Sequence, residues 1–373
     1  MKFIIEKNEL LRNVEKASKA ITGKSTLSIL KGIMIQVANG QIIMLGSDID
    51  LSILARGTCE VIDPGSMLVD AKIFIEIIRK LPNGDITIEI TEDELVNITC
   101  KKSKFSIVKM NDKEYPQFPK ETNGTKITVS KEIFRQMIGE VYFAVAQDGT
   151  RPILQGILYE VKDGILKLVA LDGYRIATSS NNVESDIDIR AIIEGNSLAT
   201  ISKLIDSNGD IKIYLHQNHV EFRLDNLIIY SRLLDGEYVN YESLLPNESK
   251  LDVTIDRLEF LNAIQRSALI AKSGDSMNPV LTLTIKNDGI LDTLIINSNS
   301  VKGRAREEIN IEIKGYENEL EIAFNGRYLE EMLKNMTADK IIMKFIGSLN
   351  PCICTPFESN YAQYLILPVR LTK

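Results

Sequence analysis

Three stretches of the chain repeat one order of apolar and polar positions. Residues 29–53 (ILKGIMIQVANGQIIMLGSDIDLSI) and residues 153–177 (ILQGILYEVKDGILKLVALDGYRIA) each predict an apolar strand, a glycine turn, a second apolar strand, and a turn with aspartate before another strand. A weaker third copy begins at Pro279. The copies start about a third of the 373-residue chain apart, which indicates three similar parts.

Amphipathic segments recur with the same spacing and predict two helices in each part. A short strand, a polar step and a helix are predicted from Phe3, from Ile127 and from Val253. Asp256 is a suitable N-cap for the helix in the third copy. The second helices are predicted at residues 71–82, 196–206 and 326–336. Alternating segments such as ITIEI and IKIYL predict antiparallel strands with one covered face.

These repeats predict an α+β fold of three topologically similar domains. Each domain would have two helices packed on antiparallel sheets with about eight strands. The repeated unit is too long for a solenoid, whose units have a few tens of residues. We place the boundaries in the polar stretches KETNGTK and PNESKLD, which gives domains of residues 1–122, 123–249 and 250–373.

The charge of the chain differs from that of a conventional DNA-binding domain, which is usually basic. Its net charge is −7, so bulk attraction to nucleic acid is absent. The faces of the six predicted helices that we expect to be exposed nevertheless lean basic. Their cations are Arg12, Lys16, Lys19, Lys72, Arg79, Lys80, Lys131, Arg135, Lys203, Arg257, Arg266, Arg327 and Lys334. If the helices share one surface, it would attract phosphates without reading bases; otherwise these are ordinary solvated faces.

Hydropathy and cysteine content predict a cytoplasmic protein. No apolar run approaches the length of a membrane span, and the first residues lack the features of a signal peptide. The four cysteines include no C-x-x-C pair. We therefore expect reduced, structural thiols rather than disulfides or a zinc site.

Three kinds of motif could carry chemistry, and each has a simpler structural explanation. The GKST stretch at residues 23–26 lacks the first glycine and the preceding strand of a P-loop. His216 and His219 have a spacing that could serve a metal, but they fall between two strand-like runs and are typical of a hairpin turn. Two aspartate pairs could hold a divalent cation but are more typical of solvated strand faces: Asp48 with Asp50, and Asp186 with Asp188. We expect no catalytic residue, no metal and no cofactor.

Several motifs, in their order and spacing, resemble those of the bacterial sliding clamps, the beta subunits of DNA polymerase III. They are LDGYRIA (171–177), YLILPVRL (364–371), DGEYVNYESLLP (235–246), and MKFIIEKNELL with GKSTLSIL near the first residue. The resemblance covers the whole chain. It implies a non-catalytic ring of two head-to-tail protomers, with helices lining a hole that holds duplex DNA and sheets on the outside.

The resemblance also implies a pocket between the second and third domains that accepts short peptides. The partners implied are the DNA polymerase III alpha subunit, the clamp loader, and other replication and repair proteins. The matching positions are Leu154, Leu171, Gly173, Tyr174, Arg175, Ile176, Val239, Leu244, Leu349, Pro351, Leu365, Leu367, Pro368, Val369 and Arg370. Such residues suit an apolar cleft with a few orienting polar groups. Tyr174 and Ser243 replace the His and Arg of some members, so the preferred peptide could differ.

Two further sets of residues follow from the resemblance. The positions that match the family's dimer interface are Phe105 and Ile107 on a predicted edge strand, and Leu269 and Ile270 at a helix end. Burial within one protomer is the competing explanation for them. The DNA-binding positions are Lys24, Arg79, Gln147 and Arg151.

Two other classes of function remain as alternatives to a DNA-encircling scaffold. One is a metal-dependent hydrolase that uses the aspartate pairs. It would need catalytic groups converging from several segments, and the sequence offers no such set. The other is a β-rich assembly protein without a nucleic acid partner. It would leave the basic helix faces of an acidic chain unexplained.

Overall fold

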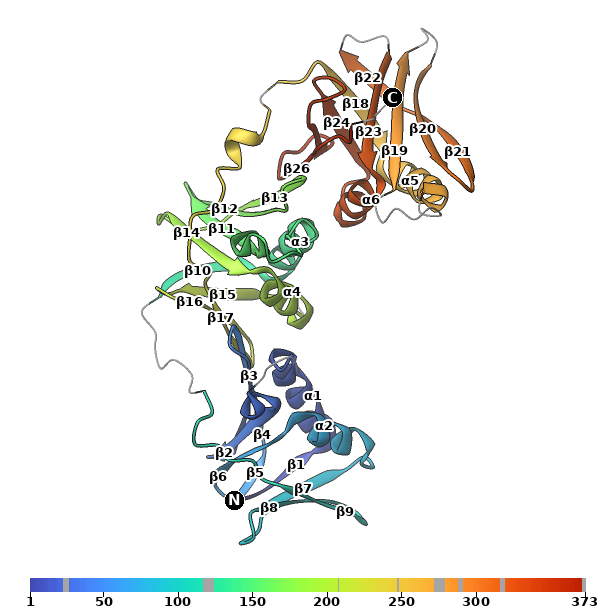
Figure 1. The fold of residues 1–373 in the computed structure, drawn as a ribbon. Helices are drawn as coiled ribbons and strands as arrows, with labels where there is room; N and C mark the ends of the chain where they lie inside the picture. Colours follow the sequence, from blue (N-terminus) through green and yellow to red (C-terminus); the bar gives the residue numbers. More distant parts are fainter. Residues whose placement is uncertain are drawn as a thin grey trace. The chain divides into compact units, whose positions relative to one another are not determined.

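The computed structural model describes residues 1–22, 27–116, 124–206, 208–246, 248–271, 279–287, 291–315 and 319–370. Within these ranges it contains six α-helices (Figure 1). They are α1 (Lys7–Ala17), α2 (Ala71–Lys80), α3 (Lys131–Tyr142), α4 (Gly195–Leu204), α5 (Arg257–Ala271) and α6 (Gly326–Asn335). None of these helices is long and apolar enough to cross a membrane. The prediction of two helices in each third of the chain is therefore confirmed.

The chain divides into two compact units, and each unit combines residues from more than one third of the sequence. The first unit contains residues 1–132 and 196–233. The second contains residues 133–195 and 234–373. The middle third is thus shared between the two units.

Two antiparallel sheets form the first unit. One has the order β5 (Glu60–Asp63), β1 (Lys2–Glu6), β7 (Asp85–Ile90), β8 (Leu95–Cys100) and β9 (Ser103–Val108). The other has the order β10 (Thr125–Ser130), β15 (Asp210–Leu215), β16 (His219–Leu224), β17 (Leu227–Arg232), β4 (Leu51–Thr58), β3 (Gln41–Ser47), β2 (Gly32–Ala38) and β6 (Gly65–Asp70). The pairing of β17 with β4 joins strands from the first and middle thirds into one sheet.

Two further antiparallel sheets form the second unit. The larger has the order β14 (Ile189–Glu194), β11 (Gly156–Lys162), β12 (Ile165–Leu171), β13 (Arg175–Asn182), β26 (Ala362–Ile366), β25 (Cys352–Pro356), β24 (Lys340–Phe345), β18 (Leu251–Asp256) and β22 (Glu312–Gly315). The smaller has the order β21 (Gly303–Asn310), β20 (Asp292–Ser300), β19 (Val280–Asn287) and β23 (Glu319–Asn325). Strands β13 and β26 join the middle and last thirds.

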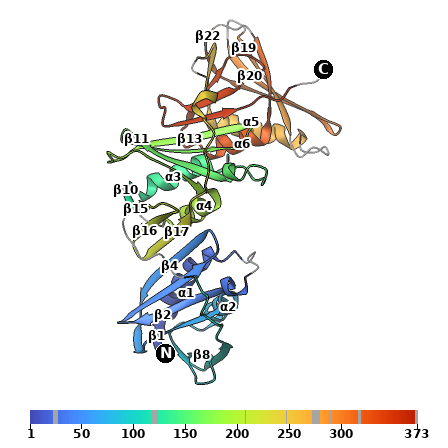
Figure 2. The same cartoon turned by 60° about the vertical axis from the view of Figure 1, so that its left-hand side comes forward.

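The helices pack as their apolar stripes predict. Leu10, Val14 and Ala17 of α1 are buried, because their spacing places them on one face of the helix. Helices α1 and α2 lie side by side, as do α5 and α6 in the other unit (Figures 1 and 2). The predicted N-cap of α5 is present, since Asp256 Oδ1 accepts a hydrogen bond from the Glu259 backbone N–H at 2.8 Å.

Two sequence predictions about charged residues are wrong. Lys131 was expected on an exposed helix face, but its side chain is 1% exposed and forms a 2.6 Å ion pair with Asp225. Asp48 and Asp50 were expected on a strand, but they lie in the turn between β3 and β4. Asp48 Oδ1 accepts hydrogen bonds there from the backbone N–H groups of Asp50 (2.9 Å) and Leu51 (2.7 Å).

Candidate functional site

An apolar cluster in the second unit contains several of the predicted peptide-binding residues. It comprises Ala146, Leu154, Leu158, Val169, Leu171, Ile176, Ile192, Tyr238, Tyr241 and Leu365, with Ile153, Leu234, Val239 and Leu245 packed against it. Ile176 of β13 and Leu365 of β26 are register partners, so their side chains lie next to each other on the sheet. The structure therefore brings together side chains from the middle third, from the segment that links β17 to β18 (the linking segment, residues 233–250) and from the last strand.

Two tyrosines fix the linking segment to this cluster. The Tyr238 hydroxyl donates to the carbonyl oxygens of Gly156 (3.3 Å) and Val169 (3.2 Å). The Tyr241 hydroxyl donates to Glu160 Oε2 at 3.2 Å. Burial raises the pKa of both phenols, so both stay protonated donors at neutral pH. Neither tyrosine was among the predicted site residues.

The sequence repeat contained a signal for Tyr238, because the first third has a tyrosine at the related position. Tyr115 occupies the related position in the first third, and its hydroxyl donates to the carbonyl oxygens of Gly32 (3.3 Å) and Leu45 (3.0 Å). These acceptors lie in β2 and β3, whereas Tyr238 binds the corresponding strands β11 and β12. A tyrosine at the end of the first repeat and another at the end of the second therefore tie each end to the strands of its own repeat.

A tight turn carries Gly173 and Tyr174 at the edge of the cluster. Gly173 has a φ of +91°, which a residue with a Cβ resists. Asp172 Oδ1 accepts hydrogen bonds from the backbone N–H groups of Tyr174 (2.9 Å) and Arg175 (3.1 Å). The Tyr174 side chain is exposed. Its carbonyl oxygen accepts a hydrogen bond from the Leu367 N–H at 2.9 Å, which ties the C-terminal segment to the turn.

Arg175 is buried beneath this turn rather than presented on the surface. Its guanidinium forms ion pairs with Asp172 (2.9 Å) and Glu331 (2.6 Å) and donates to the Phe143 carbonyl oxygen at 2.6 Å. It also lies over the rings of Phe143 and Tyr328, 5.2 and 4.4 Å from their centroids. Arg175 therefore holds the turn against α6 and positions the surface around it.

The remaining predicted peptide-binding residues are partly or largely exposed. Leu244, Leu349 and Leu367 are exposed, so apolar surface is available beside the buried cluster. Residues with intermediate or high exposure also include Val239, Pro351, Pro368, Val369 and Arg370. The backbone N–H of Val369 donates to the Ala323 carbonyl oxygen at 2.8 Å. Neither Leu349 nor Arg370 belongs to the apolar cluster.

The predicted DNA-binding residues are exposed where the structure describes them. Gln147 and Arg151 lie in the segment after α3, and Lys24 lies outside the described residues. Arg79 is exposed on α2 but forms ion pairs with Glu15 (2.7 Å) and Glu76 (2.5 Å). Its positive charge is thus partly balanced by neighbouring carboxylates.

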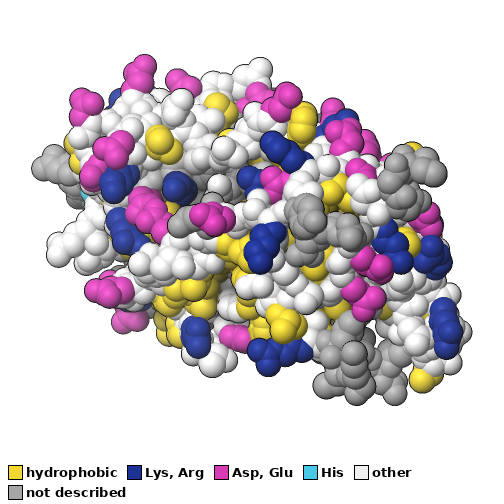
Figure 3. All heavy atoms as spheres, turned by 90° about the horizontal axis from the view of Figure 1, so that it is seen from above, with side chains coloured by type: hydrophobic (Ala, Val, Ile, Leu, Met, Phe, Trp, Pro, Cys, Tyr) yellow, Lys and Arg dark blue, Asp and Glu magenta, His cyan; other side chains and the backbone are white. Residues whose placement is uncertain are grey.

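Many other helix cations are balanced in the same way. Pairs are formed by Arg12 with Glu9, Lys16 with Asp206, Arg266 with Glu307, Arg327 with Glu331, and Lys334 with Glu330. On the face seen in Figure 3, Lys and Arg side chains are interspersed with Asp and Glu. The helix faces are therefore less basic than the cations alone predict, which favours weak, salt-sensitive phosphate contacts.

The predicted dimer residues include large exposed apolar side chains. Strand β9 is an edge strand of the five-stranded sheet. Phe105 on this strand is 42% exposed, and Ile107 is partly buried. Leu269 on α5 is 70% exposed, and Ile270 is partly buried. Complete burial within one protomer therefore does not account for Phe105 and Leu269.

The histidine and aspartate motifs considered for metal binding lie in or beside turns and loops. His216 and His219 flank the β15–β16 hairpin turn, as predicted, and their rings stack with centroids 4.3 Å apart. Asp186 and Asp188 were also expected on a strand face, and that prediction is wrong, because they lie in the loop between β13 and β14. In the described ranges, no three His, Cys, Asp or Glu side chains are grouped so that they could hold a metal ion. The hydrolase hypothesis is not supported.

Comparison with known proteins places the chain in one family. Models of the DNA polymerase III beta subunit match along the chain: the N-terminal domain at residues 1–119, the central domain at 128–240 and the C-terminal domain at 242–370. The beta sliding clamps of Bacillus subtilis and Halalkalibacterium halodurans are 33% and 31% identical, each over 99% of this chain and 100% of the relative.

Solved structures agree over the same length. The crystal structure of the DNA polymerase sliding clamp from Bacillus subtilis has a TM-score of 0.95 and 31% identity, covering 100% of both chains. The DNA polymerase III subunit beta from Pseudomonas aeruginosa has a TM-score of 0.92 and 25% identity, also covering 100% of both chains. The fold, the repeated architecture and these relatives together show that the chain belongs to the DNA polymerase III beta subunit family, the beta sliding clamps.

Proposed function

We propose that two copies of this chain close head to tail into a ring around duplex DNA. The ring would hold DNA polymerase III and other replication proteins on the template in the cytoplasm, without catalysing a reaction and without a cofactor. In this proposal the domains are residues 1–122, 123–249 and 250–373. The observation that carries it is the likeness to sliding clamps over the whole chain, together with two helices in every third.

The charge distribution is compatible with a ring that slides. A topological link does not require tight binding, so a chain with a net charge of −7 can still track along DNA. Many helix cations are balanced by nearby carboxylates, which weakens their contacts with phosphates. Arg151 and Gln147 are exposed and are proposed, with Lys24 and Arg79, to contact the phosphates.

The proposed peptide site is the exposed apolar surface beside the buried cluster. Tyr174, Leu244 and Leu367 would contact the apolar side chains of a partner peptide, while the cluster beneath them keeps that surface in place. A related clamp from Pseudomonas aeruginosa was solved bound to griselimycin, so a ligand can occupy a clamp of this fold. The proposed partners are the DNA polymerase III alpha subunit, the clamp loader and other replication and repair proteins.

The ring is tested by loading the protein onto nicked circular DNA and then cutting the circle. Clamp loader from the same bacterium would load the protein, and gel filtration would measure how much stays with the DNA. We expect retention on the circle and loss after linearisation, because a topological link ends where the duplex ends. Equal retention on circular and linear DNA would contradict the proposal.

The peptide site is tested separately with exposed side chains, which can be shortened without opening the core. Leu367→Ala and Tyr174→Ala should each weaken binding of the polymerase alpha subunit about five- to twentyfold. Ile187→Ala is a matched control, because Ile187 is also exposed but lies in the loop after β13. Unchanged binding by both site variants, measured by surface plasmon resonance, would refute this assignment.

A further inference from the structure

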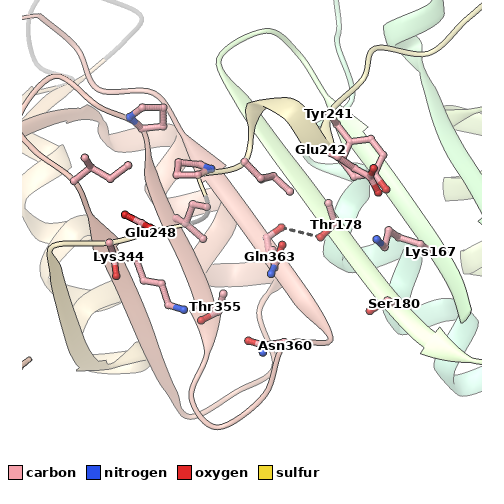
Figure 4. Close-up of a pocket in the computed structure, with 16 residues that line it drawn as sticks. Lys167, Thr178, Ser180, Tyr241, Glu242, Glu248, Lys344, Thr355, Asn360 and Gln363 are labelled. Carbon is pink, nitrogen blue, oxygen red and sulfur yellow. Dashed lines mark hydrogen bonds between the residues drawn. The ribbon is translucent and has the colours of Figure 1, made fainter.

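A polar hollow lies between the linking segment and the nine-stranded sheet of the second unit (Figure 4). Its volume is about 510 Å³, within the usual range of ligand sites. Thr178 of β13 and Gln363 of β26 line it and are register partners. They lie two residues beyond Ile176 and Leu365, and therefore on the same face of the sheet as the apolar cluster.

The hollow is continuous with the proposed peptide site. Tyr241 and Leu245 line the hollow and also pack in or against the apolar cluster. Pro351, one of the predicted peptide-binding residues, lines it as well. A bound peptide can therefore extend from one site into the other, and the two differ in chemistry.

Two lysines give the floor of the hollow its positive charge. Lys167 comes from β12 and Lys344 from β24, and both are partly buried. In Figure 4 their amino groups point into the hollow from opposite sides, with Gln363 between them. Lys167 lies 5.8 Å from the centroid of the Tyr241 ring.

Neither ammonium group has a carboxylate within ion-pair distance in the part of the chain that the structure describes. A partly buried cation without an acidic partner has lost hydration that no counter-charge replaces. The two groups differ in this from helix cations such as Arg12, Lys16, Arg266, Arg327 and Lys334, which are paired. They are therefore available to an acidic ligand.

Neutral donors lie beside the lysines. The Thr355 hydroxyl and the side-chain amides of Asn360 and Gln363 line the hollow and form no hydrogen bond with other described residues. A hydroxyl and an amide can each donate to a carboxylate or a peptide carbonyl. The floor thus offers both charge and directed donors.

Two glutamates at the rim decide which acidic ligand fits. Glu242 and Glu248 belong to the linking segment, line the hollow and are exposed to solvent. Water screens their charge more than that of the floor. A duplex, with its dense row of phosphates, would meet these carboxylates across the rim, whereas a single side-chain carboxylate can pass between them. The charge pattern therefore favours an acidic peptide over nucleic acid.

We propose that this hollow binds acidic residues of a partner peptide whose apolar residues occupy the adjoining apolar site. Lys167 and Lys344 pair with the carboxylates, while Asn360 and Gln363 donate to the peptide. The inference rests on the proposed peptide site and extends it by naming the chemistry of the flanking segment. Peptides that carry acidic residues beside their apolar ones are thereby preferred over peptides that lack them.

The test compares two synthetic peptides that share an apolar half with leucine and phenylalanine. One ends in a tail of glutamates and the other in an equal tail of glutamines. Fluorescence anisotropy with the full-length protein should give a dissociation constant about five- to tenfold lower for the glutamate tail at low salt. This preference should disappear in the Lys167→Gln/Lys344→Gln double variant and shrink as salt is raised.

A matched double variant controls for the change in net charge. Lys162→Gln/Lys314→Gln removes two exposed lysines of the same unit outside the hollow, and it should keep the full preference. Loss of the preference in this control, or its survival in the Lys167→Gln/Lys344→Gln variant, would overturn the inference.

A second measurement separates this inference from the proposed peptide site. Hexaglutamate without an apolar half is coupled to the protein with a carbodiimide, and mass spectrometry locates the linked lysines. Enrichment at Lys167 and Lys344 over Lys162 and Lys314 is expected even if the apolar half of the longer peptides does not bind. If neither of the two longer peptides binds, the proposed apolar peptide site is contradicted, whereas the proposed hollow is not. Equal labelling of all four lysines would by itself overturn the inference that the hollow binds acidic residues.

Discussion

Arg175 is the residue on which most contacts of the candidate site converge. Its side chain is 5% exposed and pairs with two carboxylates, Asp172 and Glu331. The planar guanidinium also lies over two aromatic rings and donates to a backbone carbonyl oxygen. An ammonium group has neither this flat surface nor this fork of donors. The position is therefore specific for arginine, although the formal charge would be the same with lysine.

Arg175→Lys is expected to lower the free energy of unfolding by about 2 kcal/mol, because two partly buried carboxylates lose well-oriented donors from a buried cation. The turn that carries Tyr174 should also loosen, so binding of the polymerase alpha subunit should weaken. Urea unfolding and the binding measurement check the two effects. Arg190→Lys is the control, since Arg190 is exposed and lies 3.8 Å from Glu160. A loss of stability equal to that of the control would show that the buried network contributes nothing.

Single charged residues mark the limit of what the sequence predicts. The apolar positions Leu154, Leu171 and Leu365 are buried, as periodicity and the family resemblance imply. Lys131 has the spacing of an exposed helix residue, yet it is buried because Asp225, far along the chain, supplies its counter-charge. Helical periodicity reports which face a residue occupies, and it does not report whether a distant carboxylate makes burial of a cation tolerable.

At the scale of elements, a buried carboxylate connects α3 to parts of the last third. Glu140 of α3 is 1% exposed. It accepts hydrogen bonds from Gln136 Nε2 (2.8 Å) and from Ser179 Oγ on β13 (2.7 Å). Thr337, after α6, donates to it at 3.5 Å. Burial raises the pKa of Glu140 above its ordinary value, and these hydrogen bonds only partly oppose the rise.

The raised pKa gives a pH dependence with a definite sign. Protonated Glu140 is favoured in the folded state, so its contribution to stability is fully present below the unfolded pKa, near 4.5, and is lost as pH rises through the folded pKa. The amide in Glu140→Gln cannot ionise but retains both donor and acceptor capacity. The variant should therefore gain stability relative to the wild type as pH rises from 4.5 towards neutrality.

Urea unfolding at a series of pH values measures this difference. Taking the variant minus the wild type cancels the titration of all other groups that the two proteins share. Ser185→Ala is a useful reference, because it removes a surface hydroxyl in the same unit without changing a titrating group. A difference between Glu140→Gln and the wild type that is constant with pH would contradict the raised pKa.

The sequence predicts the elements better than it predicts their partners. Alternation of apolar and polar residues predicts β7 and β15 as strands and shows which of their side chains share a face. It does not reveal that β13 pairs with β26, or β17 with β4, because alternation is the same whatever strand lies alongside. The polar hollow depends on the first of these pairings and could not have been predicted from the repeat.

At the scale of the whole molecule, the proposed ring requires two different surfaces of each chain to meet. Phe105 lies on the edge strand β9 in the first unit, and Leu269 lies on α5 in the second. A head-to-tail contact pairs one kind of surface with the other, whereas an isologous contact pairs each surface with the same surface of the second chain. The two arrangements predict different results when damaged surfaces are combined.

Phe105→Asp and Leu269→Asp should each produce a monomer, with the 41.8 kDa mass of one chain in sedimentation. The free energy of unfolding should change by less than about 0.5 kcal/mol for Leu269→Asp, because that side chain is 70% exposed. Val301→Asp, at a residue 94% exposed on the β20–β21 turn, should remain a dimer and serves as the control.

Mixing the two monomeric variants gives the deciding observation. The Leu269→Asp chain retains an intact Phe105 surface, and the Phe105→Asp chain retains an intact Leu269 surface. In a head-to-tail assembly these two intact surfaces form one normal interface, so the mixture should sediment at twice the mass of one chain. The other interface then carries both aspartates and stays open, so this mixed dimer should not be retained on circular DNA. A mixture that stays monomeric, while each variant is folded, would exclude the head-to-tail arrangement through these surfaces.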